Sequence, residues 1–508
     1  MSSEHTNLPE PFIQRQLIKL EHFGNRLPHP TMLFLYFCGI VLLLSLFASL
    51  IGLSALHPVT GEQINAINLL SAQGLRDILS KAVTNFTSFA PVGTVLVAVM
   101  GIGVAEHSGL LRVLLQRTIL RAPRQMMTFL VVFAGVMSSL AADTGYVVLV
   151  PLAGMVFAAA GRHPVAGIAA AFAGVSGGYS ANLLVGPLDA ILSGLSTEAA
   201  LLVDPTYEVT VTANFYFIVV STVLIGIVGT LVTERWVSPM LGEYKGEIET
   251  VSDVSEKESK ALKTVFVFTL FFIGLVVAAV APENAPLRDP ATGSVLRSPF
   301  ISGIVLIISV YAAIAGWIFG FSSGKFRSSK EVVLGMDSAM ATMASYIVLM
   351  FFAAQFVSWF GWSQLGTITA IKGAEGLQAL NPHPAVLLVC FVVLCAFINL
   401  FIGSASAKWA LLAPIFVPML LLSGISPEAT QVAYRVGDST TNIITPLMPY
   451  FGVVVAFVQK YDKDAGIGTM LATMMPFSLA FLLSWSVMLA IWIVLGIPLG
   501  PGAPIFVG

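Results

Sequence analysis

The chain has 508 residues, of which 56% are hydrophobic and only 10% are charged. Because a soluble domain carries about 25% charged residues, this chain cannot cover a globular surface in water, which excludes a soluble enzyme, a coiled coil and a disordered chain. The net charge of −2 leaves no basic surface for nucleic acid, so the composition predicts a polytopic membrane protein embedded in a lipid bilayer.

Residues 1–30 are polar, and we expect them to form a cytoplasmic segment. No small-residue cleavage site follows the first apolar run, so 31–54 is interpreted as a retained span rather than a signal peptide. Apolar stretches of the ~20 residues that cross a bilayer follow at 88–106, 164–186, 214–232, 262–281, 299–320, 341–360, 428–459 and 469–498. Residues 31–498 are therefore predicted to form one all-α transmembrane domain, and 499–508 an external tail.

Two further apolar stretches, 126–160 and 385–423, are interrupted by small and polar residues at 138–144 and 403–408. Each could be two spans or one re-entrant hairpin. With hairpins and a cytoplasmic N-terminus, most lysines and arginines between spans lie inside, as the positive-inside rule requires. The segment 187–213, which has acidic but no basic residues, is then an external loop. The charge pattern favours nine spans plus two hairpins.

An offset of 263 residues relates the two interrupted stretches and the spans that follow them. Pro151, Gly161, Pro164, Gly174 and Ser176 recur at this offset as Pro414, Gly424, Pro427, Gly437 and Ser439, and Tyr146 matches Trp409. In the predicted topology the first copy (126–195) starts inside and the second (385–459) outside. The pattern therefore indicates an inverted repeat, which is typical of secondary transporters with a binding site near the membrane midplane.

Each copy also contains a predicted break within a span, at 174–182 and 437–442. Unwound backbone is tolerated at membrane depth only where it lines a cavity or is buried in protein. Asn182 and Asn442 close the breaks, with Ser180 and Ser439 beside them. These oxygens could bind Na⁺ or could cap helix ends. Because inverted copies bring equivalent breaks together, we expect Asn182 and Asn442 to approach each other.

Arg435 and Asp438 stand three residues apart in one apolar span, on one helix face. A charge at the bilayer centre costs about 2.5–3.5 kcal/mol on insertion scales, so such a pair indicates function; a structural ion pair is the alternative. Arg435 offers a fork for a substrate carboxylate, and Asp438 could accept a proton or a cation.

The tip of the second hairpin contains Ser406 and is followed by Trp409, which could stack on a flat substrate ring or serve as packing. We expect Lys408, beside it, to snorkel to the external surface. Asp143, at the first tip, and Asp189, after the first broken span, could relay protons; Asp189 could instead be a solvated external residue.

No cofactor is expected beyond a coupling ion. The three cysteines, Cys38, Cys390 and Cys395, lie in apolar runs. Their number and spacing suit neither a disulfide framework nor a metal site. The remaining candidates for an ion are Na⁺ and H⁺.

The chain resembles the AbgT family of p-aminobenzoyl-glutamate transporters. The matching segments are 24–30, 161–164, 180–183, 193–198, 403–406, 414–419, 437–439 and 500–502. The resemblance implies nine transmembrane helices plus two opposed hairpins in a homodimer of a bacterial-type cytoplasmic membrane. It also implies import of p-aminobenzoyl-glutamate, or export of sulfonamide antimetabolites, driven by the proton-motive force or Na⁺.

The functional positions of that family match Asp189, Asn399, Trp409, Pro427, Arg435 and Asp438. Lys408 departs from the uncharged residue that the resemblance leads us to expect. An aminobenzoyl ring would stack on Trp409, and a carboxylate or sulfonamide would meet Arg435.

The sequence leaves two other functions to compare with transport of an aromatic substrate. A Na⁺-coupled di- or tricarboxylate symporter of similar architecture would need no ring platform, so Trp409→Ala should be mild there. An intramembrane aspartyl protease using Asp143 and Asp438 requires Gly-x-Gly-Asp, whereas the sequence before Asp438 is Arg435-Val436-Gly437. The protease motif is therefore missing.

Overall fold

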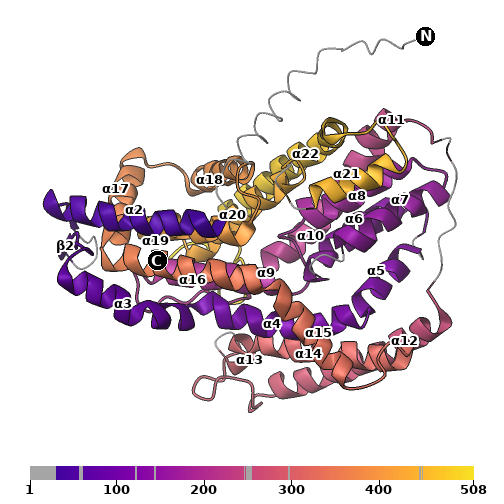
Figure 1. Cartoon of the computed structure of the whole chain (residues 1–508), viewed down its shortest axis with the longest axis horizontal. Coiled ribbons are helices and arrows are strands. Elements are labelled where there is room, and N and C mark those ends of the chain that lie inside the picture. The colour runs from indigo at the N-terminus through magenta and orange to yellow at the C-terminus, as the bar shows by residue number, and fades with distance from the viewer. Residues whose placement is uncertain are drawn as a thin grey trace, which may run out of the picture.

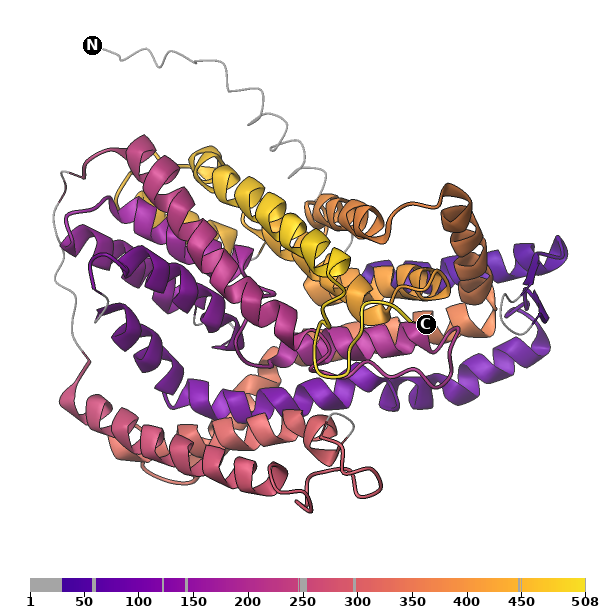
Figure 2. The ribbon, with the colours of Figure 1, turned by 180° about the vertical axis from the view of Figure 1, so that it is seen from behind.

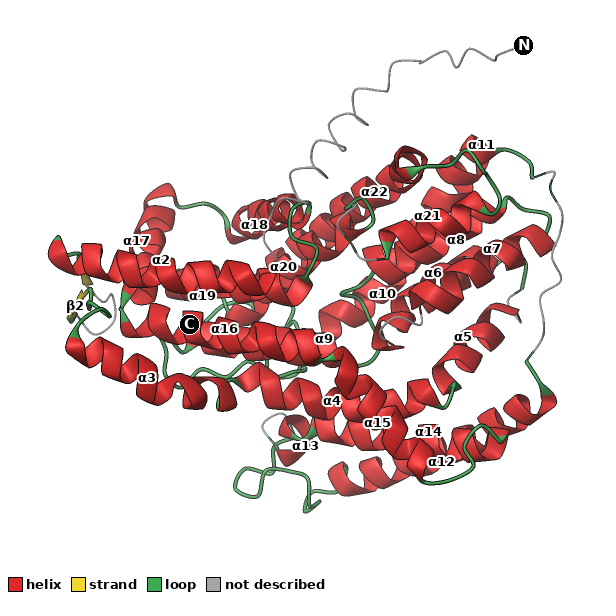
Figure 3. Cartoon of the chain, viewed as in Figure 1, coloured by secondary structure: helices red, strands yellow, loops and turns green. Residues whose placement is uncertain are grey.

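The computed structural model describes residues 30–56, 61–120, 123–141, 145–244, 246, 254–295, 298–445, 448 and 450–507. It is mostly helical, with one short antiparallel pair of strands, β1 (Ser54–Leu56) and β2 (Gln63–Asn65) (Figure 3). Within these residues, eight helical segments are long and apolar enough to cross a membrane. The prediction of an all-α membrane protein is confirmed at this level. The N-terminal segment and Asp143 lie outside the described residues.

The first half of the chain contains the following elements. They are α2 (Pro30–Leu50), α3 (Ala72–Thr87), α4 (Ala90–His107), α5 (Leu110–Leu120), α6 (Met127–Met137), the 3₁₀ turn η1 (Ser138–Ala141), the π turn η2 (Gly145–Leu149), α7 (Val150–Ala159), α8 (Pro164–Phe172), the π turn η3 (Ala173–Gly177), α9 (Pro187–Ala200), α10 (Phe215–Val232), the π turn η4 (Thr233–Val237) and α11 (Ser238–Leu241).

The second half continues with helices only. They are α12 (Glu256–Val280), α13 (Pro299–Ser302), α14 (Ile304–Ser323), α15 (Lys330–Thr342), α16 (Ala344–Trp362), α17 (Leu365–Leu380), α18 (Pro384–Asn399), α19 (Ala405–Leu422), α20 (Pro427–Asn442), α21 (Phe451–Gln459) and α22 (Ile467–Val494).

The helices pack in three neighbouring groups. One group places α14 and α15 against α4, with α12 outside them along one long edge of the molecule (Figures 1 and 2). In another, α16 packs on α2 and α3. The third contains α6–α8, α10, α18, α20 and α22. Helix α9 contacts α4, α19 and α20 and so joins the first group to the third.

The prediction of an external loop at 187–213 is wrong, because its first half forms α9, which is buried. Its Asp189 and Glu198, together with Ser193, Ser196 and Thr197, lower its hydropathy below that of a span. Helix α9 is stabilised by packing between α4 and α19, which a hydropathy pattern does not register. The polar helix α17 was missed for the same reason.

The residues related by the 263-residue offset have matching backbone roles. Gly161 and Gly424 both have positive φ, +75° and +83°, which glycine adopts without a steric penalty. Pro164 and Pro427 each occupy the first turn of the helix that follows, α8 and α20, where the missing N–H costs no hydrogen bond. The matched positions therefore turn the chain and restart a helix in the same way.

Gly174 and Gly437 are the second matched pair of glycines. A Cβ on Gly174 would lie 2.2 Å from the carbonyl oxygen of Val132 in α6, and one on Gly437 would lie 2.4 Å from that of Val392 in α18. Each glycine therefore lets its helix approach the backbone of the helix that begins the preceding interrupted stretch.

The predicted break at 437–442 is wrong in position. Helix α20 continues to Asn442, and the next helix, α21, begins at Phe451. In the first copy the chain leaves regular α-helix at Ala173, one residue before the predicted break at 174–182. The other interruption, predicted at 403–408, lies earlier in the chain. Helix α18 ends at Asn399, and α19 begins at Ala405, with Ser404 as its N-cap.

The C-terminal segment packs against the transmembrane core. The Ser426 N–H donates to the carbonyl of Ile505 over 2.9 Å, and the Val507 N–H donates to that of Gly424 over 3.0 Å. Ile505 is buried. This contact holds the turn before α20, where the functional helix begins.

Candidate functional site

A cluster of buried charged and polar side chains lies where α9, α19 and α20 meet. Lys408, Arg435 and Asp438 are 0%, 3% and 1% exposed, and Asp189 is 5% exposed. Every residue of α20 is buried. Burial at this depth requires each charge to have a partner, so the pairing defines the site.

Arg435 is paired with Asp189 and not with Asp438 as predicted. Its Nη2 lies 2.5 Å from Asp189 Oδ1. The other oxygen of Asp189 accepts from the Gly186 N–H over 2.7 Å at the start of α9. A carboxylate in the first turn is stabilised by the helix dipole, so the local structure holds Asp189 in place. The alternative of a solvated external Asp189 is therefore wrong.

Asp438 is paired with Lys408, whose Nζ lies 2.5 Å from Asp438 Oδ1. Lys408 Nζ also donates to Asn399 Oδ1. The prediction that Lys408 snorkels to the surface is wrong, since its side chain is completely buried. The side chain points into the protein because its ammonium group forms an ion pair with Asp438 there and donates a hydrogen bond to the amide oxygen of Asn399.

Asn399 connects the end of α18 to the end of α20. Its Nδ2 lies 2.6 Å from the Asp438 carbonyl oxygen, 2.9 Å from Thr441 Oγ1 and 2.9 Å from Asn442 Oδ1. These bonds satisfy polar groups in the last turn of α20. They explain why the helix persists through the small and polar residues at which a break was predicted.

Asn182 caps the chain after the first break. Its Oδ1 accepts from the N–H groups of Leu183 and Leu184 at 2.8 and 3.1 Å, and its Nδ2 donates to Ser139 Oγ over 2.8 Å. Asn182 thus has the capping role, and both the oxygen and the nitrogen of its side-chain amide have hydrogen-bond partners. Ser139 belongs to η1, at the predicted first tip.

The two copies contact each other through Ser180 with Ser439 and through Ser176 with Asn442, and not through Asn182 with Asn442. The Ser180 N–H donates to Ser439 Oγ over 3.1 Å, and Asn442 Nδ2 donates to the carbonyl of Ser176 over 3.4 Å. No hydrogen bond links Asn182 to Asn442 in the described part of the chain. The first break therefore faces α20 where the second break was predicted, but the hydrogen bonds join other residue pairs than Asn182 and Asn442.

Trp409 is fully buried in a stack with Tyr434, with ring centroids 4.5 Å apart. Its Nε1 donates to the Leu192 carbonyl and to Ser196 Oγ, at 3.2 and 3.1 Å, both in α9. The Tyr434 hydroxyl lies 3.2 Å from Asp438 Oδ1. One ring face of Trp409 is therefore covered in this conformation. Sequence reasoning missed Tyr434, although it directly precedes Arg435.

Ser406 and Pro427 lie farther from the charges. Ser406 Oγ is 3.3 Å from Ser404 Oγ, at the start of α19. Pro427 begins α20, directly after the cap Ser426. Pro427 therefore positions the helix that carries Arg435, and Ser406 borders the cluster at the other end.

Three polar atoms of the cluster are buried without a hydrogen-bond partner. They are Arg435 Nε, Ser180 Oγ and Asp438 Oδ2. Arg435 Nη1 lies 3.5 Å from the Ser180 carbonyl, so two of the three belong to adjacent side chains. Buried polar groups are rarely left unpaired, and an exception requires an explanation. A site that accepts a polar ligand supplies one.

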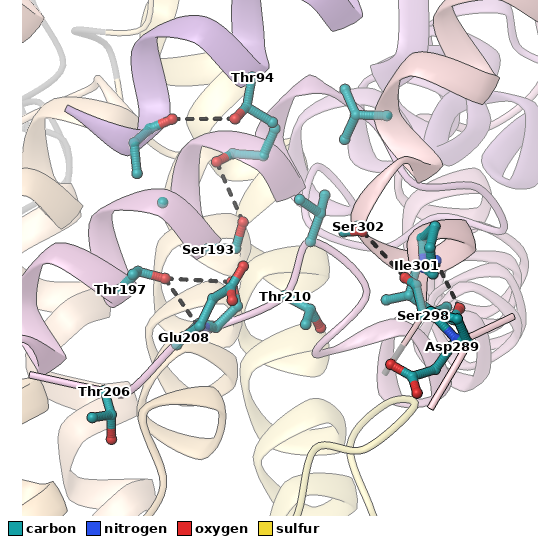
Figure 4. A pocket seen from close by; sticks show the side chains of 18 residues that line it. Thr94, Ser193, Thr197, Thr206, Glu208, Thr210, Asp289, Ser298, Ile301 and Ser302 are labelled. Carbon is teal, nitrogen blue, oxygen red and sulfur yellow. Dashed lines mark hydrogen bonds between the residues drawn. The ribbon is translucent and has the colours of Figure 1, made fainter. Parts of the chain in front are cut away.

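A separate polar cavity of about 850 Å³ lies on the other side of α9 (Figure 4). Its walls come from α4, α9, the segment 206–211 and the segment 289–305. Ser193 and Thr197 of α9 line it, whereas Asp189 and Ser196 contact Arg435 and Trp409. Helix α9 is therefore the wall between the cavity and the buried cluster.

The whole chain is similar to known membrane transporters. The sequence profile of the AbgT putative transporter family matches residues 15–507. The p-aminobenzoyl-glutamate transport protein of Escherichia coli (strain K12) is 37% identical over 484 residues, which are 95% of each chain.

Two solved structures are similar over nearly the whole chain. The Alcanivorax borkumensis YdaH transporter has a TM-score of 0.90 and 54% identity, and it covers 93% of this chain and 100% of its own. Neisseria gonorrhoeae MtrF, described as one of a class of antimetabolite efflux pumps, has a TM-score of 0.92 and 45% identity, with coverage of 96% and 100%. These relatives are membrane transporters and not enzymes. This chain belongs to the AbgT putative transporter family and is a multi-pass membrane transporter.

Proposed function

We propose that this protein is a secondary active transporter of p-aminobenzoyl-glutamate or of related aromatic antimetabolites such as sulfonamides. The names of the relatives support this substrate class. Transport would run as uptake or efflux and would be driven by the proton-motive force or Na⁺. The natural location is a bacterial-type cytoplasmic membrane, with the N-terminus on the cytoplasmic side and two chains in a homodimer.

The observation that carries the proposal is the juxtaposition of Arg435 and the Trp409–Tyr434 stack. Arg435 has an unpartnered Nε in a buried cluster, and Trp409 is joined by hydrogen bonds to the same helix, α9, that supplies the partner of Arg435. A guanidinium recognises a carboxylate or sulfonamide oxygen, and an aromatic platform recognises a flat ring. An aminobenzoyl-glutamate molecule carries both groups.

The proposed architecture is nine transmembrane helices with two oppositely oriented re-entrant hairpins, in one domain of residues 31–498. The equivalence of Gly161 with Gly424, and of Gly174 with Gly437, supports two inverted copies, 126–195 and 385–459. In such transporters the two copies surround a site near the midplane and expose it alternately to each side.

Access to the cluster requires α9 to move relative to α19 and α20, because α9 closes the cluster against the 850 Å³ cavity. The hydrogen bonds from Trp409 to α9 and the ion pair from Arg435 to Asp189 hold that wall shut. A substrate carboxylate that competes with Asp189 for Arg435 would release one of these contacts.

The test is flux in proteoliposomes that contain the purified protein, with imposed proton and Na⁺ gradients. Radiolabelled p-aminobenzoyl-glutamate and a sulfonamide should move, whereas succinate and citrate should not. Protein-free vesicles and the Arg435→Ala variant are the controls. Movement of succinate or citrate, with no flux of the aromatic compounds, would instead support a dicarboxylate symporter and overturn the proposal.

A further inference from the structure

The buried cluster is electrically neutral as it stands. Arg435 and Lys408 contribute two positive charges, and Asp189 and Asp438 contribute two negative charges. Glu428, the other buried carboxyl group of α20, lies in the first turn of the helix and accepts from Tyr207 instead. An extra cation would give the cluster a net positive charge inside the membrane, where an uncompensated charge is costly.

A sodium site among the predicted ligands requires free oxygen atoms around an anionic group. The strongest set on α18 and α20 is the Asp438 carboxylate with Asn399 Oδ1. Lys408 Nζ contacts Asn399 Oδ1 and one of the two carboxylate oxygens of Asp438, Oδ1, so Asp438 Oδ2 is the one oxygen of this set without a hydrogen-bond partner. Asn442 Oδ1 already accepts from Asn399, and Ser439 Oγ accepts from the Ser180 N–H. One free carboxylate oxygen does not fit a Na⁺ ion while the Lys408 ammonium is in place, because two cations on a single buried carboxylate would repel each other and leave an uncompensated charge.

We propose that the Lys408 ammonium is the resident cation of this site, held by Asp438 and Asn399 in place of a mobile Na⁺. The assignment itself does not depend on the proposed transport function. Its consequence does rest on that function: the wild-type protein transports its substrate without Na⁺ at this position. Lys408 is carried by α19 and Asp438 by α20. The tethered charge therefore joins these two helices as a bound ion would.

Removal of Lys408 should create a sodium site. In Lys408→Ala the cluster has a net charge of −1, and the lost side chain leaves space beside Asp438 and Asn399. A hard cation bound by carboxylate and amide oxygens would restore neutrality. Lys408→Met is the matched control, because it removes the charge but fills most of the volume.

The experiment measures thermal unfolding of purified full-length protein in NaCl, KCl and choline chloride at equal ionic strength. The midpoint of the wild type and of the exposed control Lys372→Ala should be the same in all three salts. Lys408→Ala should be destabilised in choline chloride and regain roughly 2 °C or more in NaCl, because a ligand that binds only the folded state raises its stability. Lys408→Met should show no selective response.

A Na⁺-selective rise in the wild-type midpoint would overturn the proposal, and so would equal midpoints for Lys408→Ala in all three salts. If Lys408→Ala folds too poorly for unfolding curves in choline chloride, the yield of monodisperse protein extracted in NaCl and in choline chloride replaces the midpoint. The double variant Lys408→Ala/Asp438→Asn, which lacks both charges, should fold without Na⁺ and lose the response. These measurements need no transport, so they remain valid if no substrate moves in the flux assay.

Discussion

The matched spans of the two copies, α8 with the turn after it and α20, share glycine, proline and serine positions but differ in charge. Between His163 and Asp189, in α9, helix α8 and the turn after it contain no acidic or basic side chain. Helix α20 carries Glu428, Arg435 and Asp438 within one buried helix. The two copies thus have the same backbone turns and close helix contacts. The second copy supplies most of the charged residues, and the first supplies α9, whose Asp189 pairs with Arg435.

This difference teaches that the repeat conserves geometry rather than chemistry. Gly174 and Gly437 must remain glycines because of the backbone that each one faces. The matched pair Ser176 and Ser439 has no such constraint, and the two make different contacts. The predictions below test which parts of the equivalence are real, from the largest expected effect to the smallest.

The largest effect is expected for Arg435→Ala, which leaves Asp189 buried without its partner. Breaking a buried ion pair costs about 3–5 kcal/mol, so the variant should lose both stability and substrate binding. The double variant Arg435→Ala/Asp189→Ala should recover stability but not binding. Thermal unfolding and equilibrium binding of radiolabelled p-aminobenzoyl-glutamate measure the two properties separately.

Arg162→Ala is the matched control, since Arg162 forms a half-exposed pair with Glu234 outside the cluster. Exposed pairs contribute about 0–1 kcal/mol, so this variant should bind normally. A double Arg435/Asp189 variant that still transports substrate would show that the pair is only structural.

Gly174→Ala and Gly437→Ala should destabilise the protein by similar amounts, at least 1–3 kcal/mol each, which is the usual cost of overpacking. In each case the new methyl group meets a backbone carbonyl oxygen that cannot rotate away. Gly452→Ala, in α21, has open space and should be neutral or slightly stabilising. Unfolding midpoints measure all three, and a large difference between the first two would contradict structural equivalence.

Trp409→Phe should reduce substrate affinity about tenfold, or roughly 1.4 kcal/mol, because it loses the hydrogen bonds that hold the ring against α9. Trp485→Phe is a close control, since Trp485 is also buried and donates to a serine, Ser221, over 2.8 Å. Its loss should affect stability but not affinity. Equal affinity of the two variants would exclude Trp409 from the binding site.

The smallest effect is expected for Ser439→Ala, which removes the acceptor of the Ser180 N–H. The cost should be about 1 kcal/mol, or up to about 3 if the buried N–H stays unpaired. Ser176→Ala should cost less, because its hydroxyl contacts only the weakly accepting sulfur of Met448. Comparison of the two unfolding free energies tests whether the matched serines have diverged in role.

Much of the site could be predicted from particular residues. Arg435 and Asp438 stand out as charges in an apolar stretch, and Trp409, Asn182 and Ser180 were placed by the repeat and by family resemblance. The structure brings Arg435 and Ser180 to the junction of the two copies, whereas Asn182 bonds within the first copy. The position of the second break could not be predicted, because α20 is held helical by Asn399, which lies 43 residues before Asn442.

The sequence alone determined the membrane class, most of the spans, the family and the identity of the helix that carries the charges. Hydropathy and residue spacing depend only on neighbouring positions in the sequence, so they can be determined without the tertiary structure. Only the tertiary structure decided which charges pair: Arg435 with Asp189, 246 residues away, and Asp438 with Lys408. A buried charge must find a partner, but the sequence does not say which one, because that depends on how α9, α19 and α20 approach one another.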